Sequence, residues 1–113
     1  MNWVVAILVS AIVTAVPAAA SVAPFAIILD SWSPYYQPAI AIVAAGTPIE
    51  WMNPTASPHT IRHDGCVTGE ECAFDSGPVA PDQVYRLPDV PPGRYAYHCE
   101  LHPLMRGVLL IIE

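Results

Sequence analysis

Thirteen prolines are distributed along this chain of 113 residues, and they restrict its possible folds more than any other feature. Proline lacks a backbone N–H and fixes φ, so it interrupts helices and central strands but fits turns and strand ends. Between the prolines from Pro24 onward lie short runs rich in β-branched and aromatic residues. Such runs, separated by turns at intervals of roughly 8–12 positions, are typical of a sandwich or small barrel. The sequence therefore predicts an all-β fold.

Short alternating runs predict where the strands lie. Seven segments have this pattern: 25–29, 39–43, 49–53, 59–63, 84–87, 94–98 and 107–112. The segments 31–38 and 64–82 are expected as irregular connections, the second being the longest in the chain. In a strand, alternate residues share a face, so Tyr95, Tyr97 and Cys99 are expected on the core side and His98 on the other.

The first 29 residues contain no charged side chain, and positions 3–16 form a dense apolar run. The small residues that end at Ala20 resemble an export cleavage site, which predicts a signal peptide over 1–20. The uncharged stretch also approaches the about 20 residues that cross a bilayer, so an uncleaved membrane anchor is the alternative. Either interpretation places a domain formed by residues 23–113 outside the cytoplasm.

Charge excludes one class of partner. Ten acidic residues stand against four arginines, lysine is absent, and the formal net charge is −6. A surface of this sign repels phosphate backbones, so nucleic acid is not an expected partner.

The three cysteines divide into a pair and a single residue. Cys66 and Cys72 could close a small disulfide ring in an oxidising compartment, which leaves Cys99 in need of a separate role. A competing hypothesis combines both paired cysteines with His59 and His63, because two imidazoles and two thiolates at this spacing can hold a structural zinc ion.

Near the end of the chain, Cys99, His102 and Met105 recur at every third position, and His59 follows a proline forty residues upstream. One thiolate, two imidazoles and one thioether form the ligand set of a type 1 copper site, in which the methionine is a weak axial ligand. The sequence therefore predicts a copper site formed by His59, Cys99, His102 and Met105.

Three segments resemble the cupredoxins, the family of small blue copper proteins that includes amicyanin and plastocyanin. They are the last ligand loop at 93–107, a strand at 46–53 and the first-ligand segment at 57–60. The short C-x₂-H-x₂-M spacing is most similar to that of amicyanin. The resemblance implies a Greek-key β-sandwich over 23–113, one copper ion on the four residues above, and single-electron transfer without catalysis.

The resemblance also implies roles around the ligands. Thr60 is expected to bond across to the cysteine loop, and His102 to be the partly exposed imidazole through which electrons pass. An apolar collar of Pro58, Pro103 and Leu104 would then contact redox partners such as a c-type cytochrome or an oxidase. The chain could also act as a subunit of a membrane complex. A copper carrier, using the same residues in a more open site, is the remaining alternative.

Overall fold

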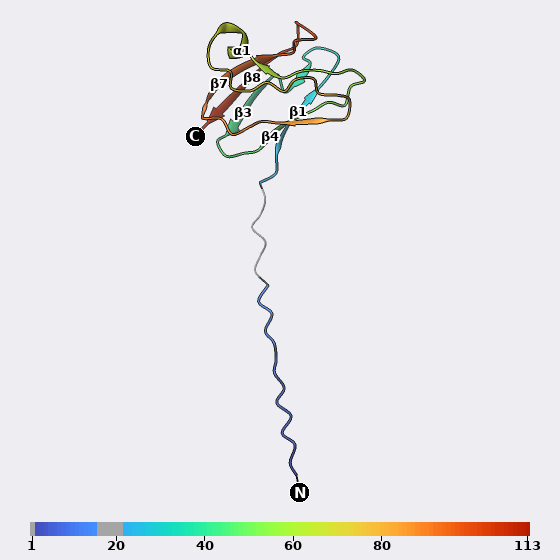
Figure 1. Ribbon diagram of the computed structural model, residues 1–113, viewed down its shortest axis with the longest axis vertical. Coiled ribbons are helices and arrows are strands. Elements are labelled where there is room, and N and C mark those ends of the chain that lie inside the picture. Colours follow the sequence, from blue (N-terminus) through green and yellow to red (C-terminus); the bar gives the residue numbers. More distant parts are fainter. Residues whose placement is uncertain (1, 16–21) are drawn as a thin grey trace.

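Two four-stranded β-sheets pack against each other in the computed structural model, which describes residues 2–15 and 22–113 (Figure 1). The first sheet has the order β2-β1-β4-β6, with the strands Tyr36–Gln37, Phe25–Leu29, Ile49–Met52 and Val84–Arg86. The second has the order β3-β8-β7-β5, with the strands Ile40–Ala44, Arg106–Ile112, Gly93–His98 and Arg62–His63. A short helix, α1, spans Gly65–Thr68.

Each sheet mixes parallel and antiparallel pairs. β1 pairs in parallel with β4, and β3 pairs in parallel with β8, whereas the other neighbours are antiparallel. The chain passes repeatedly from one sheet to the other, as a parallel pair within a sheet requires a crossover connection. This arrangement confirms the predicted all-β, Greek-key sandwich.

Alternate residues of the strands form the core between the sheets. In β7, Tyr95 and Tyr97 are buried, and the alternation continues to the buried Cys99 beyond the strand. Trp51 of β4 meets the Tyr97 ring edge-on at a centroid distance of 5.5 Å. Tyr36 of β2 makes a similar edge contact with Tyr97 at 4.8 Å. Such edge-to-face pairs fix ring orientation, and here they rigidify the layer directly beneath Cys99.

The predicted strand at 59–63 is wrong over most of its length. Only Arg62 and His63 pair with β7, whereas His59 forms an isolated bridge with Val79. The physical reason is that the 64–82 segment folds back along this part of the chain and supplies its own pairing partners. The 64–82 segment is also less irregular than expected, because it contains α1. The connection predicted at 31–38 likewise contains a strand, β2.

The N-terminal segment has no helix or strand over residues 2–15, and its apolar side chains are exposed. The expected cleavage position at Ala20 lies outside the described residues. Within the described ranges, no helix has the length and apolar character needed to span a bilayer.

Candidate metal centre

The side chains of His59, Cys99 and His102 converge at one end of the sandwich. Their possible ligand atoms all lie within 4.8 Å of one another. Nδ1 of His59 is 3.1 Å from Nδ1 of His102, and Nδ1 of His102 is 3.7 Å from Sγ of Cys99. Residues forty positions apart in the sequence therefore place two imidazole nitrogens and one sulfur around a common point.

These separations fit a single metal ion. In protein zinc sites, whose bond lengths serve as a guide, imidazole nitrogens lie about 2.0 Å and thiolate sulfurs about 2.3 Å from the ion. With near-tetrahedral or trigonal angles, two nitrogens are then about 3.3–3.6 Å apart, and a nitrogen and a sulfur about 3.5–3.8 Å apart. The 3.7 Å distance between His102 and Cys99 lies in the second range, and the 3.1 Å distance between the two imidazole nitrogens is slightly shorter than the first. One soft thiolate with two imidazoles is also the equatorial donor set of a type 1 copper site. The residues present therefore fit copper.

His59 is held by the end of β4 and by the segment that precedes β6. Its backbone forms two hydrogen bonds with Val79. The His59 N–H donates to the Val79 carbonyl at 3.2 Å, and the His59 carbonyl accepts from the Val79 N–H at 2.8 Å. The buried Asn53 amide donates to the carbonyls of Val79 and Ser57, each at 2.9 Å. Ser57 Oγ lies 3.4 Å from His59 Nε2, the ring nitrogen that faces away from the site. The orientation of the His59 ring is therefore fixed by the backbone bonds to Val79 and by the contact of its outer nitrogen with Ser57.

Cys99, His102 and Met105 belong to one tight loop between β7 and β8. The Cys99 N–H donates to the Met105 carbonyl at 3.1 Å, and the Met105 N–H donates to the His102 carbonyl at 2.8 Å. Cys99 is 1% exposed and Met105 is fully buried, whereas His102 is exposed. The loop thus turns the sulfur residues inward and leaves one imidazole at the surface.

Thr60 connects the two parts of the site. Its N–H donates to Cys99 Sγ at 3.3 Å, and its Oγ1 accepts a hydrogen bond from the Glu100 N–H at 2.8 Å. Its carbonyl accepts a hydrogen bond from the Tyr36 hydroxyl at 2.7 Å. The bond expected between Thr60 and the cysteine loop is therefore confirmed, and it is made twice.

Burial favours the neutral form of the inner imidazole, that of His59. Desolvation, with a further contribution from His102, lowers the pKa of His59 below its ordinary value. The neutral form has a free ring lone pair, which is the form that binds a metal ion.

The other two histidines lie outside this cluster. His98 points to the opposite side of β7, as predicted, and its Nδ1 lies 2.6 Å from Asp64 Oδ1. His63 accepts a hydrogen bond from the Ala73 N–H at 3.1 Å and packs against Phe74.

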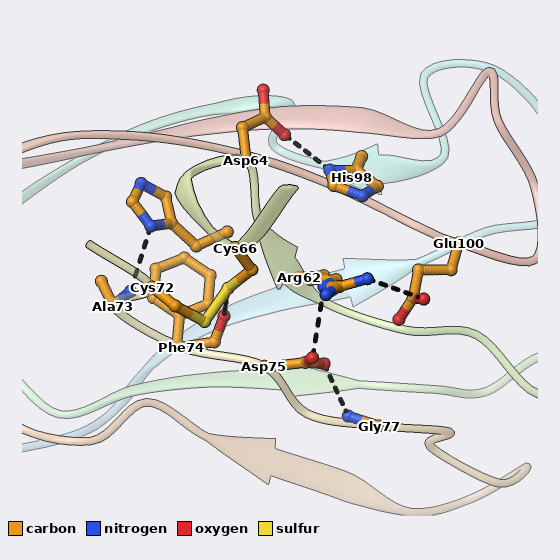
Figure 2. The surroundings of a disulfide bond; sticks show 11 residues. Arg62, Asp64, Cys66, Cys72, Ala73, Phe74, Asp75, Gly77, His98 and Glu100 are labelled. Atoms are coloured by element: carbon orange, nitrogen blue, oxygen red, sulfur yellow. Dashed lines mark hydrogen bonds and ion pairs between the residues drawn. A yellow bond between two sulfur atoms is a disulfide. The ribbon is translucent and has the colours of Figure 1, made fainter. Parts of the chain in front are cut away.

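The zinc hypothesis is wrong. Cys66 and Cys72 form a disulfide, shown in Figure 2, and a disulfide sulfur is not a thiolate ligand. This pairing confirms the alternative expectation for the two cysteines. Cys99 is the free cysteine of the chain, and it lies in the cluster with His59 and His102.

Sequence reasoning missed the polar residues that support the ligands. Asn53 is 1% exposed although it carries an amide, and only the turn-forming Asn-Pro pair that ends β4 marked it in the sequence. Arg62 forms an ion pair at 3.0 Å with Glu100, the residue after Cys99, and the two are 38 positions apart. No local pattern signals such a pair.

A two-sheet β-sandwich with one thiolate and two imidazoles converging at its end defines the class of type 1 copper electron-transfer proteins. Comparison with known proteins agrees. The chain is 35% identical to amicyanin from Paracoccus denitrificans over 94 residues, which is 83% of this chain and 71% of that protein. It is 26% identical to plastocyanin from Prochlorothrix hollandica over 105 residues, covering 90% and 80% of the two chains.

Solved structures give the same result, although no protein-family model matches the chain. A Cu(I) form of an amicyanin variant superposes with a TM-score of 0.64 at 32% identity, covering 80% of this chain and 86% of that one. A purple cupredoxin from Nitrosopumilus maritimus gives a TM-score of 0.66 at 25% identity, with 78% and 99% coverage. The chain belongs to the cupredoxins, the blue copper proteins that carry electrons.

Proposed function

We propose that His59, Cys99, His102 and Met105 ligate one copper ion and that the protein relays single electrons between redox proteins. The convergence of His59 Nδ1, Cys99 Sγ and His102 Nδ1 within 4.8 Å carries this proposal. Met105 is the fourth member because it is buried and because its backbone closes the loop that holds Cys99 and His102.

The chemistry that copper supplies when bound is a one-electron exchange between Cu(II) and Cu(I). The chain's residues would hold the ion in either state. Cys99 would offer a soft thiolate, His59 a neutral imidazole, and Met105 a weakly binding thioether. The Thr60 N–H stabilises negative charge on the sulfur and fixes its direction. A rigid site of this kind has little to reorganise when the electron moves.

His102 is the route by which electrons enter and leave. It is exposed, and the loop around it presents apolar side chains, with Leu101 50% and Leu104 80% exposed. Pro58 and Pro103 are also exposed, so the predicted collar of Pro58, Pro103 and Leu104 is available to a partner. A brief apolar contact with a c-type cytochrome, an oxidase or another redox protein suits this surface. The protein itself performs no catalysis.

The protein works outside the cytoplasm. A disulfide persists in an oxidising compartment such as the periplasm or the outer face of a membrane, and Cys66 and Cys72 form one. Residues 1–20 act either as a signal peptide that is removed or as an anchor that holds the 23–113 domain at the membrane, alone or within a larger complex.

A titration of the purified protein with Cu(II), followed by visible absorption and EPR, tests the function. We expect an intense blue thiolate band that saturates at one copper per chain, with narrow copper hyperfine splitting, and no such band in Cys99→Ala. Binding of Cu(I) without a stable coloured Cu(II) form would instead indicate a copper carrier. A blue Cys99→Ala protein would refute the ligand assignment.

A further inference from the structure

Arg62 lies between two carboxylates that belong to different parts of the chain. Its Nη1 donates a hydrogen bond to Glu100 Oε2 at 3.0 Å, and its Nε lies 3.3 Å from Asp75 Oδ2. The second contact is an ion pair whose alignment falls short of a hydrogen bond. Figure 2 shows the guanidinium group between the two acids. One side chain therefore joins the loop that follows Cys99 to the 64–82 segment.

The Glu100 side of this bridge leads to the copper ligands. Glu100 directly follows Cys99, and its N–H donates to Thr60 Oγ1 at 2.8 Å. The N–H of Thr60 in turn donates to Cys99 Sγ at 3.3 Å. Arg62 is two residues after Thr60, and its backbone is in register with His98 of β7. A shift of Glu100 would therefore alter its own hydrogen bond to Thr60 Oγ1 and, through Thr60, the hydrogen bond to Cys99 Sγ.

The Asp75 side leads to the disulfide segment. Asp75 forms an isolated bridge with Arg62, and its Oδ1 accepts a hydrogen bond from the Gly77 N–H at 3.1 Å. Cys66 Sγ, a member of the disulfide, is 3.4 Å from the carbonyl of Phe74, the residue before Asp75 (Figure 2). The carboxylate that faces Arg62 is thus held by the turn at Gly77, and the residue before Asp75 lies against the disulfide.

We propose that Arg62 is a positioning residue for the copper site, which it serves by tying the Cys99 loop to the disulfide segment through Glu100 and Asp75. This inference rests on the proposed function and extends it to a residue that contacts no ligand. Through Arg62, the 64–82 segment supports the Thr60–Cys99 hydrogen bond from outside the sandwich.

The role depends on the shape of the guanidinium group and not only on its charge. Its planar fork places two separate nitrogens near two carboxylates, with Nη1 donating a hydrogen bond to Glu100 and Nε in an ion pair with Asp75. The single ammonium of lysine cannot reach both in the same geometry. The net stability involved is small, because Arg62 and Glu100 are 28% and 41% exposed and solvent screens the pair. The effect is therefore expected in local order at Thr60 and Glu100, with little change in global stability.

Amide hydrogen exchange of the copper-free protein tests the tie directly. We expect Arg62→Gln and Arg62→Lys each to raise the exchange rates of the Thr60 and Glu100 amides by up to about fivefold, the factor that corresponds to the loss of an exposed ion pair. The matched control is Arg86→Gln, because Arg86 pairs with Glu50 at 3.7 Å on the other sheet and is 84% exposed. That variant should leave both amides unchanged.

The copper-loaded proteins supply the second measurement. Both Arg62 variants should broaden the copper hyperfine lines and shift the thiolate absorption band relative to the wild type and to Arg86→Gln. The inference is overturned if Arg62→Gln exchanges at wild-type rates. It is also overturned if Arg62→Lys matches the wild type in both measurements, since charge alone would then suffice. A wild-type protein that forms no blue site would count against the proposed function, while the exchange result would still decide whether Arg62 orders the loop.

Discussion

The backbone N–H of Thr60 donates a hydrogen bond to Sγ of Cys99 across 3.3 Å. The side chain of Thr60 accepts another from the Glu100 N–H, so this one residue is bonded to two successive residues of the cysteine loop. Because Thr60 also directly follows His59, it fixes the distance between two of the proposed ligands from a single position. Donors that surround a ligand in this way orient it and tune its metal.

Replacement of Thr60 by valine should loosen this connection. Valine keeps the shape and the backbone N–H but removes the Oγ1 acceptor, which leaves the Glu100 N–H without its partner. We expect a loss of about 1 kcal/mol in the free energy of unfolding of the copper-free protein, measured by urea denaturation. Thr60→Ser keeps the acceptor and should lose less. Equal losses in the two variants would show that the hydroxyl contributes nothing.

Much of the fold follows from local sequence pattern. The strand at 25–29 was predicted to the residue, and β7 and β8 each extend one residue beyond prediction at the N-terminal end. Alternation also placed Cys99 on the core side and His98 outside, because the period of a strand is a property of the backbone itself. The position of a strand, and the sheet face on which each of its side chains lies, therefore both follow from a few neighbouring residues.

The surroundings of the site depend on contacts between distant segments. The strand predicted at 59–63 is reduced to Arg62 and His63, because Val79, from the 64–82 segment, pairs with His59 instead. β2 has only two residues, too few for any period to be recognised. Spacing nevertheless predicted that His59, Cys99 and His102 lie together, as they do in the structure, because this combination of residue types is distinctive of one kind of metal site.

Met105→Leu tests whether Met105 is a copper ligand. Leucine preserves apolar bulk at this buried position but offers no thioether, so the protein should still bind copper with a higher reduction potential. The potential is measured by voltammetry. Met52→Leu is the matched control, because Met52 lies on β4 and is 39% exposed. If both variants had the wild-type potential, Met105 would be excluded as a ligand.

Removal of the disulfide should separate stability from metal binding. Cys66 and Cys72 close a ring with a sequence separation of 6. Loop-closure entropy for so short a ring predicts a loss of about 2 kcal/mol when both are replaced by serine. Copper should still bind at one ion per chain, because neither cysteine belongs to the cluster of His59, Cys99 and His102. Denaturation curves and metal analysis together check this; a drop in copper content would contradict it.

Gly107 leaves room for the central tyrosine of the core. It lies opposite Tyr97 in the β7–β8 pair, and a Cβ at this position would overlap the Tyr97 ring. Gly107→Ala should therefore destabilise the protein by about 1–3 kcal/mol, the usual cost of overpacking. Gly93→Ala is the control, since a Cβ there would lie 3.5 Å from the Tyr95 hydroxyl, an ordinary contact. Thermal unfolding of both variants would reveal similar stabilities if the Tyr97 ring could move aside freely.

Tyr36 makes the stability of the protein sensitive to alkaline pH. Burial, with smaller contributions from Cys99 and Tyr97, raises the pKa of Tyr36 above its ordinary value of 10.0. The folded state therefore retains the phenolic proton that the unfolded chain loses near pH 10, so this contribution to stability is complete below pH 10 and declines as the pH rises further. Tyr36→Phe lacks that group and also lacks the hydrogen bond to the Thr60 carbonyl.

The variant should consequently be about 1 kcal/mol less stable than the wild type at pH 7, where only the hydrogen bond counts. Above pH 10 the wild type alone loses stability through this residue, so the difference should shrink by up to about 1.4 kcal/mol per pH unit. Urea denaturation of the two copper-free proteins from pH 7 to about pH 11 measures the difference directly, since ionisation of the other tyrosines is common to both. Parallel stability curves would mean that Tyr36 ionises equally readily in the folded and unfolded chains.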